Sequence, residues 1–246
     1  MNRLTSLYRS SIGKKFIAAV TGLILFGFLL GHVAGNLKVF TGADADGVPH
    51  IDSYGAFLRI VGEPFLPAMF GLWIARSVLL VSLILHVAVV IQLSWQSKKA
   101  RPIGYVRSKK SAASLPAMYM MFSGSVILFF IVFHILHFTA GALPFLGDFE
   151  HGQVYNNLAN SFANPVVGIL YIFFMVVLAF HLYHGVWSLF QTLGLDNPDR
   201  NKALRMFALV ASIGIAAGLA SIPIAYMLGA VPAESYEYSH KLLENH

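Results

Sequence analysis

The chain has 246 residues, of which 57% are hydrophobic and only 11% are charged, and its formal net charge is +6. Its mean hydropathy is +0.68, and about a quarter of the residues of a soluble domain are charged. These values identify an integral membrane protein. The sequence contains no cysteine, which excludes disulfides, thiolate-bound metals, iron–sulfur clusters and haem attached through thioether bonds. A bound metal must therefore be held by histidine or by oxygen ligands.

Five apolar segments are long enough to span a membrane, because about 20 helical residues cross the hydrocarbon core. They cover residues 17–40, 68–95, 117–142, 165–191 and 204–229. The first segment is too long for the apolar region of a signal peptide, so we expect it to remain as a helix. The connections are polar or rich in turn-forming residues. We therefore predict an all-α bundle of five transmembrane helices that forms a single domain over residues 1–246.

The charged residues predict the orientation of the bundle. Thirteen of the 17 basic residues flank the predicted spans on one side, within residues 3–15, 98–110 and 200–205, and nine of the eleven acidic residues lie on the other. Cytoplasmic loops carry the excess of Lys and Arg in membrane proteins. We therefore expect the N-terminus in the cytoplasm and the C-terminus outside. The basic charge is a topology signal, and no motif supports nucleic-acid binding.

Four histidines lie in four different apolar segments, and polar groups inside a membrane helix usually face a partner or a cavity and mark function. With a rise of 1.5 Å per residue, His32 and His134 lie about 21 and 24 Å from the cytoplasmic ends of their helices, and His86 and His181 about 14 and 15 Å. The histidines thus form an outer and an inner pair. Each pair has the two neutral imidazoles that bis-histidine haem ligation requires. We predict that the four residues bind two haem irons.

Alternatives to this interpretation remain at individual positions. His137 and His184 each follow a predicted ligand by three residues, but their depths of about 28 and 10 Å match the proposed partners less well. They are candidates for contacts with haem propionates or a quinone. An interhelical hydrogen bond explains any single membrane histidine equally well. A zinc site lacks a carboxylate partner, and a proton or metal transporter would carry carboxylates inside the spans.

Other residues near the histidines fit a large, flat, anionic cofactor. The small residues Gly31, Gly35 and Gly185 lie next to the predicted ligands, where bulkier side chains would obstruct a porphyrin, although close helix packing explains such glycines equally well. Cations are candidate partners of haem propionates, and a few polar groups at the end of an apolar slot would suit a quinone. The propionate candidates are Arg76 and Lys38 for the outer haem and Lys14, Lys15 or Arg205 for the inner one, and the quinone candidates are Arg59, Glu63 and His137.

The chain resembles the di-haem, five-helix cytochrome b anchor subunit of succinate dehydrogenase and fumarate reductase. The resemblance covers nearly the whole chain and rests on four segments. These are SSIGKKFIAAVTGLILFGFLLGHVAGNLKVF at residues 10–40, LILHVAVV around His86, IVFHILHFTAG at residues 131–141 and AFHLYHGVWSLFQTLG at residues 179–194. The resemblance implies the same ligand pairs, His32 with His134 in the haem distal to the soluble subunits and His86 with His181 in the proximal haem.

The resemblance also implies a function in a larger complex. A flavoprotein subunit and an iron–sulfur subunit would dock on the cytoplasmic face of a bacterial inner membrane, and this chain would pass electrons to a quinone, menaquinone, with the oligomeric state of the complex left open. The dicarboxylate chemistry belongs to the partners, so no catalytic residue is expected here. Some fumarate reductases of this group carry a proton-transferring glutamate in the stretch that corresponds to Leu178-Ala179-Phe180 of this chain. The absence of this glutamate here favours succinate oxidation. A cytochrome b subunit of a hydrogenase or formate dehydrogenase, and a non-haem transporter, remain alternatives.

Overall fold

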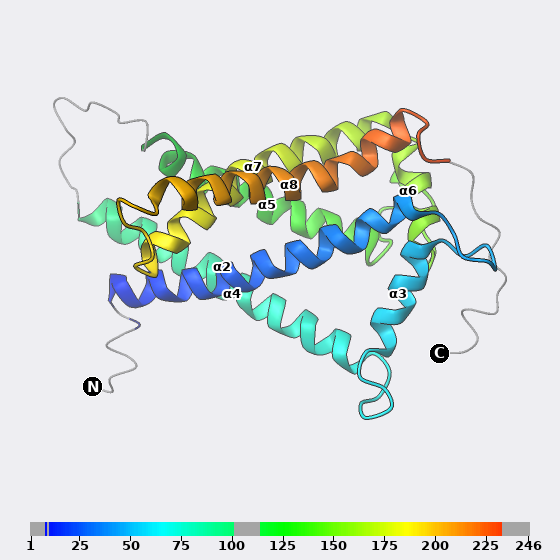
Figure 1. The fold of residues 1–246 in the computed structure, drawn as a ribbon, viewed down its shortest axis with the longest axis horizontal. Helices are drawn as coiled ribbons and strands as arrows, with labels where there is room; N and C mark the ends of the chain where they lie inside the picture. The colour runs from blue at the N-terminus through cyan, green and yellow to red at the C-terminus, as the bar shows by residue number, and fades with distance from the viewer. Residues whose placement is uncertain (1–7, 9, 101–113, 233–246) are drawn as a thin grey trace.

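The computed structural model describes residue 8, residues 10–100 and residues 114–232. The described residues form helices and no strand. Five long helices dominate the structure (Figure 1): α2 (Ser11–Asn36), α4 (Phe70–Lys99), α5 (Ser114–Phe138), α7 (Pro165–Thr192) and α8 (Asn201–Met227). All five are long and apolar enough to cross a membrane. The predicted all-α bundle of five spanning helices is confirmed.

Shorter helices lie in or next to the two connections that the sequence predicts to be polar or turn-rich, and the first of them covers the end of the predicted span 17–40. They are η1 (Leu37–Thr41) and α3 (His50–Ile60) between α2 and α4, and η2 (Pro144–Leu146) and α6 (Val154–Phe162) between α5 and α7. Seven of the nine residues of α6 are buried. Tertiary packing, rather than the propensity of so short a segment, therefore stabilises this helix.

Hydropathy predicted the helix ends less well than the helices themselves. The first helix begins at Ser11 instead of residue 17, because the Ser10 hydroxyl caps it by accepting the Gly13 N–H at 2.9 Å. The third ends at Phe138 instead of residue 142, although only one of the four residues beyond it, Thr139, is polar. The start of the fourth is as predicted, with Asn164 as the capping residue and Pro165 in the first turn. Caps, rather than apolar composition, decide where these helices begin.

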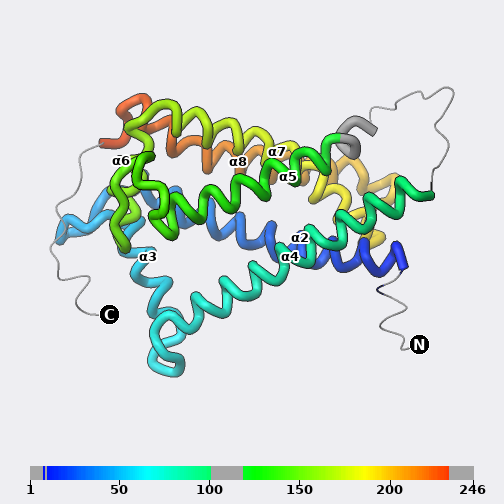
Figure 2. The backbone as a smooth tube through the Cα atoms, turned by 180° about the vertical axis from the view of Figure 1, so that it is seen from behind, coloured from blue at the N-terminus to red at the C-terminus, as the bar shows by residue number. Residues whose placement is uncertain are grey.

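The long helices run back and forth between two ends of the bundle, as Figures 1 and 2 show from opposite sides. α7 packs along α8 and α5, and α2 packs along α4 and α7. Phe174, Leu178 and Ile215 lie in the buried core between α7 and α8. The first half of α4 diverges from the bundle towards α3 (Figure 1). The fold thus consists of two pairs of helices, α2–α4 and α5–α7, with α8 packed along α7.

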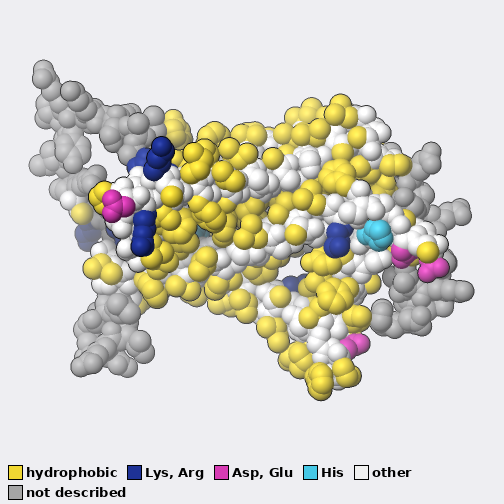
Figure 3. All heavy atoms as spheres, in the orientation of Figure 1, with side chains coloured by type: hydrophobic (Ala, Val, Ile, Leu, Met, Phe, Trp, Pro, Cys, Tyr) yellow, Lys and Arg dark blue, Asp and Glu magenta, His cyan; other side chains and the backbone are white. Residues whose placement is uncertain are grey.

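Charge is distributed unequally between the two ends of the bundle, and apolar side chains cover much of the surface between them (Figure 3). We call the end where α2 and α8 begin the basic end. Its described cations are Lys14, Lys15, Lys98, Lys99, Arg200, Lys202 and Arg205, and the described acidic residues of the opposite end are Asp44, Asp46, Asp52, Glu63, Asp148 and Glu150. Other residues used for the orientation lie outside the described residues: Arg3, Arg9, Arg101, Arg107, Lys109, Lys110, Glu234, Glu237 and Glu244. The cytoplasmic location of the basic end stays a prediction.

A buried carboxylate joins the two short helices of the opposite end. Asp52 of α3 is 5% exposed, and its Oδ1 accepts the N–H of Tyr155 in the first turn of α6 at 3.0 Å. No side chain at the start of α6 itself caps the helix, and a negative charge at this point is favourable. We expect Asp52→Ala to lower the free energy of unfolding by about 1–3 kcal/mol, because a buried donor loses its partner.

Thermal unfolding of the detergent-solubilised protein tests this expectation. Asp52→Asn is the matched variant, because its amide oxygen still accepts the Tyr155 N–H, and it should unfold closer to the wild-type temperature. Equal unfolding temperatures for Asp52→Ala and the wild type would contradict a stabilising role of this contact.

Candidate functional site

The structure brings His32 of α2 and His134 of α5 together. Their ring centroids are 5.9 Å apart and the ring planes are nearly perpendicular, at 89°. Two imidazoles on opposite sides of one metal ion are separated by about this distance, given metal–nitrogen bonds of about 2 Å. The Nδ1 atom of His134 is buried and has no hydrogen-bond partner among the described residues. Hydrogen bonds among the described residues therefore do not orient the His134 ring through this nitrogen.

Aromatic rings enclose the two imidazoles of this outer pair. Phe28 stacks on His32 with ring centroids 5.1 Å apart. Around His134 lie Phe130 at 5.6 Å, Phe138 at 5.8 Å and Tyr171 at 6.1 Å, also between ring centroids. Aromatic packing therefore restricts the orientation of His134.

The predicted inner pair consists of His86 of α4 and His181 of α7. Hydrogen bonding defines the tautomer of His86. Its Nδ1 lies 3.1 Å from the carbonyl oxygen of Ala18 and 3.2 Å from Oγ1 of Thr21. Because a carbonyl can only accept, Nδ1 must donate its proton, and the Nε2 lone pair is left for a metal. Metal-binding histidines typically donate their other ring N–H in this way.

The same argument applies to His181. Its Nδ1 lies 3.1 Å from Oγ of Ser123, and the Ser123 hydroxyl donates to the carbonyl of Met120 at 3.2 Å. With its proton engaged there, the hydroxyl accepts from His181, whose Nε2 is then the nitrogen with a free lone pair. Both inner histidines are thus held by a hydroxyl group on the preceding long helix of their own helix pair.

These hydroxyl residues are functional candidates that the sequence analysis missed. Thr21-Gly22 precedes His32 by 11 residues, and Ser123-Gly124 precedes His134 by the same interval. This repeated spacing was the signal that could have revealed them. It also relates α2 to α5, and hence the α2–α4 pair to the α5–α7 pair. Each histidine pair therefore takes one imidazole from each half of a repeated arrangement.

The glycines of the two motifs allow close contact with the inner histidines. A Cβ atom at Gly22 would lie 3.3 Å from Cε1 of His86, and one at Gly124 would lie 3.4 Å from Cε1 of His181. The distance at Gly22 is tighter than an ordinary van der Waals contact and the one at Gly124 is at its lower limit, so residues larger than alanine would displace the rings. The hydroxyl sets the rotation of each ring, and the glycine leaves room for it.

Open space adjoins three glycines of the helices that carry predicted ligands. A Cβ atom at Gly27, Gly31 or Gly185 would meet nothing within 4 Å. Gly35 is different, because a Cβ there would clash with the ring of Tyr54; this glycine makes room for α3 and not for a cofactor. No group of three or more metal-ligating side chains occurs among the described residues. The donor set is thus two imidazoles per site, as in bis-histidine haem ligation.

The two additional histidines differ from each other. His137 is 3% exposed, and both of its ring nitrogens have partners: Nδ1 lies 2.9 Å from the Tyr171 hydroxyl and Nε2 lies 3.0 Å from Oγ of Ser161. It therefore has no nitrogen left for a propionate, a quinone or iron. His184 keeps a buried Nδ1 without a partner among the described residues and lies against Trp187, with ring centroids 6.3 Å apart.

The remaining polar candidates, except for the buried Lys14, lie near the surface of the bundle. The Arg76 guanidinium is 5.1 Å from the centre of the Trp73 ring, and the Lys38 ammonium is 5.6 Å from that of Tyr54. Arg59 lies in the last turn of α3, and Glu63 is exposed in the turn that follows.

The candidates for the inner haem lie close to the basic end of the bundle. Lys14 is buried, Lys15 is exposed and the Arg205 guanidinium lies 4.2 Å from the centre of the Trp187 ring. Contacts of these side chains with propionates or quinone stay predictions.

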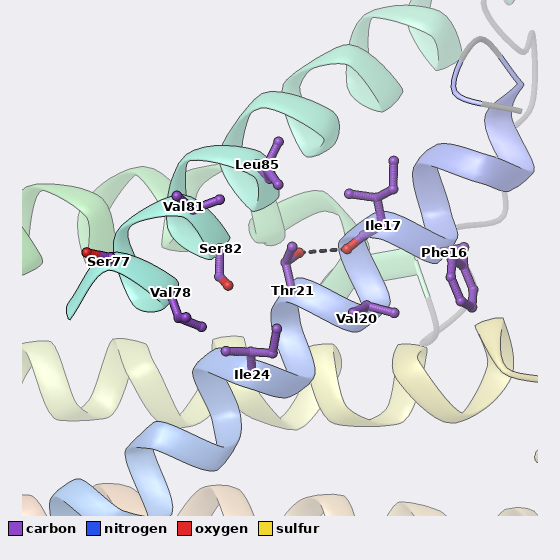
Figure 4. A pocket seen from close by; sticks show the side chains of 10 residues that line it. All are labelled: Phe16, Ile17, Val20, Thr21, Ile24, Ser77, Val78, Val81, Ser82 and Leu85. Carbon is purple, nitrogen blue, oxygen red and sulfur yellow. Dashed lines mark hydrogen bonds between the residues drawn. The ribbon is translucent and has the colours of Figure 1, made fainter. Parts of the chain in front are cut away.

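A pocket of about 520 Å³ lies between α2 and α4 and is lined almost entirely by apolar side chains (Figure 4). Val20 and Ile24 line it from α2, and Val81 and Leu85 line it from α4. Its few polar members include Ser82 and Thr21, the residue that holds His86. The pocket thus adjoins the support of an inner histidine.

Comparison with known proteins assigns the chain to a family. A family model described as succinate dehydrogenase/fumarate reductase transmembrane subunit matches residues 97–220, half of the chain. The matched region contains all of α5 and α7 and most of α8, with one histidine of each pair. No curated protein and no solved structure matches the chain significantly. The chain belongs to the family of succinate dehydrogenase/fumarate reductase transmembrane subunits.

Proposed function

We propose that this membrane subunit is a di-haem cytochrome b that carries electrons between an iron–sulfur subunit and membrane quinone. The observation that carries the proposal is the presence of two imidazole pairs, each with one histidine from the α2–α4 half and one from the α5–α7 half. His32 with His134 would bind the outer haem iron, and His86 with His181 the inner one. The family supports the anchoring role in the complex.

The residues of this chain have distinct parts in such a mechanism. When bound, a haem b supplies an iron that accepts and returns one electron. The Nδ1–H groups of His86 and His181, held at Ala18, Thr21 and Ser123, orient the imidazoles and raise their basicity towards iron. The buried apolar side chains around Leu178 would exclude water. The reduction potential of the iron would then depend on these few polar contacts. No catalytic residue is assigned to the chain.

The soluble partners belong at the basic end in this proposal. A flavoprotein subunit and an iron–sulfur subunit would dock there, on the cytoplasmic side of a bacterial inner membrane, in keeping with the excess of cations. The chain has no cysteine to bind iron–sulfur clusters, so oxidation of the dicarboxylate takes place in those partners. Placing the partners at this end puts His86 and His181 nearer to the electron donor than His32 and His134.

The quinone, which we propose to be menaquinone, would exchange electrons with a haem. Arg76, Lys38, Glu63 and His184 remain candidates for polar contacts with it or with the propionates, and His137 does not, because both its nitrogens are engaged. At the position of the family's proton-transferring glutamate, Leu178 is buried in the core and Phe180 is 70% exposed. Neither can carry a proton, so we propose succinate oxidation as the physiological direction.

Haem content is the direct test. We expect a pyridine haemochrome measurement on the complex purified through this subunit to give two b-type haems per chain, together with succinate-dependent reduction of quinone. No haem would contradict the proposal and favour a transporter. One haem would refute the two-pair arrangement, and two haems without succinate activity would favour a partner such as a hydrogenase or formate dehydrogenase.

A further inference from the structure

Three buried polar side chains from three helices form a cluster at the end of the bundle opposite the basic end. They are His137 of α5, Ser161 of α6 and Tyr171 of α7, and they are 3%, 3% and 6% exposed. The imidazole joins the other two, through Nδ1 to the Tyr171 hydroxyl at 2.9 Å and through Nε2 to the Ser161 hydroxyl at 3.0 Å. A neutral imidazole has one donor and one acceptor nitrogen, and a hydroxyl can serve either. All three groups are therefore satisfied without leaving a charge in the membrane.

Tyr171 connects this cluster to the outer histidine pair. Its ring lies 6.1 Å from that of His134 at an angle of 64° and 5.3 Å from that of Phe130, and Phe130 in turn contacts His134. On the other side, Phe138 lies between the rings of His134 and His137, at 5.8 and 4.1 Å. Two of the three rings around His134 are thus linked to the cluster: that of Tyr171, which belongs to it, and that of Phe138, which contacts His137.

His134 depends on this packing more than the inner histidines do. The Nδ1 atoms of His86 and His181 are oriented by hydrogen bonds, whereas Nδ1 of His134 has no partner among the described residues. The rotation of the His134 ring is therefore set by its aromatic neighbours. One of those neighbours, Tyr171, is also bound through its hydroxyl to His137.

The arrangement occurs in one half of the repeat. Three residues after His32, where α5 has His137, α2 has Gly35, against which Tyr54 packs. The partner imidazole His32 is stacked on Phe28 instead. The cluster thus acts on one of the two outer imidazoles and reaches neither of the inner ones through any contact described above.

We propose that His137 is a positioning residue for the outer haem, which holds Tyr171 against His134 by bridging it to Ser161 of α6. This inference rests on the proposed haem function. Without the bridge, Tyr171 gains rotational freedom and the His134 ring is no longer held at one angle. Because the angle of an axial imidazole determines its overlap with the iron orbitals, the spectrum of the outer haem should report the loss.

The test uses the purified complex and reads the two haems separately by low-temperature electron paramagnetic resonance and optical α-band spectra. The signal missing from a His32→Ala complex defines the outer haem. We expect Tyr171→Phe and His137→Leu to shift this signal, to leave the inner signal unchanged and to retain two haems per chain. His137→Gln should restore the wild-type signal, because an amide can also accept from one hydroxyl and donate to the other. The exposed His151 provides the control, and His151→Gln should change neither signal.

Several results would overturn the inference. Loss of the outer haem in His137→Leu, with retention in His134→Ala, would make His137 the ligand. An outer signal unchanged in Tyr171→Phe and His137→Leu would show that the cluster only stabilises the fold, as would equal shifts of both signals. Should His137→Leu fail to fold, Tyr171→Phe alone still decides, because its ring remains and only the hydroxyl is lost. A wild-type complex without haem would refute the proposed function itself, whereas two haems without a selective shift would refute only this inference.

Discussion

Replacing His86 or His181 with alanine should remove the same haem and leave the other in place, and replacing His32 or His134 should remove the second. The reason is the proposed pairing: the rings of His32 and His134 are in contact, and the helical rise places His86 and His181 at a similar depth. Alanine cannot bind iron, and a haem bound by one imidazole loses one of its two coordination bonds to the protein. Each variant should contain one haem per chain by the pyridine haemochrome method, and its remaining spectrum should match that of the other variant of its pair.

The additional histidines provide the controls for this experiment. His184→Ala, which leaves His181 in place, should retain two haems. Retention of the inner haem in His181→Ala together with its loss in His184→Ala would instead identify His184 as the ligand. Different residual spectra for the His86→Ala and His181→Ala proteins would contradict the inner pair altogether.

Ser123→Ala should weaken the inner haem although Ser123 is not a ligand. Loss of a partner that orients a metal-binding histidine typically reduces metal affinity or activity by about 10–100-fold, and the Ser123 hydroxyl is the group that engages Nδ1 of His181. Thr21→Val should have a smaller effect, because His86 keeps its second acceptor, the carbonyl of Ala18. The haem content of the purified complex, and its loss on dilution in detergent, measure the difference between these variants.

Ser125 is a matched control on the same helix. It is exposed, and its hydroxyl donates to the carbonyl of Met121 at 2.9 Å, so Ser125→Ala should retain the inner haem at the wild-type level. An equal loss in Ser123→Ala and Ser125→Ala would show that α5 tolerates alanine poorly and that the hydrogen bond to His181 has no special part. A larger effect of Thr21→Val than of Ser123→Ala would contradict the assignment of the Ala18 carbonyl as a second acceptor for the Nδ1–H of His86.

Depth along a helix predicted that His32 and His134 approach each other, and their ring contact agrees with this for a simple geometric reason. A residue's height in a spanning helix follows from its number, because the rise per residue is constant. Helices that alternate in direction therefore place His32 level with His134 and His86 level with His181. The prediction did not require the packing angles of the helices, only their order and direction.

The nature of the contacts around each histidine could not be predicted in the same way. His137 and His184 follow their neighbours with the same spacing, yet His137 is saturated by Tyr171 and Ser161 while His184 keeps an unpartnered nitrogen. Ser161 belongs to α6, a short helix that hydropathy does not reveal because it is not a membrane span. Whether a histidine is available to a ligand thus depended on a segment that the sequence analysis had treated as a connection.

The sequence by itself determined that this is a membrane protein of five helices with two histidine levels, because hydrophobic length and helical rise are properties of single segments. Only the tertiary structure decided which groups complete those levels. Thr21 and Ser123 support ligands on the next long helix, Asp52 caps a helix about a hundred residues away, and Gly35 makes room for α3 and not for a cofactor. Each of these contacts joins segments distant in the chain, and a local pattern cannot specify its own distant partner.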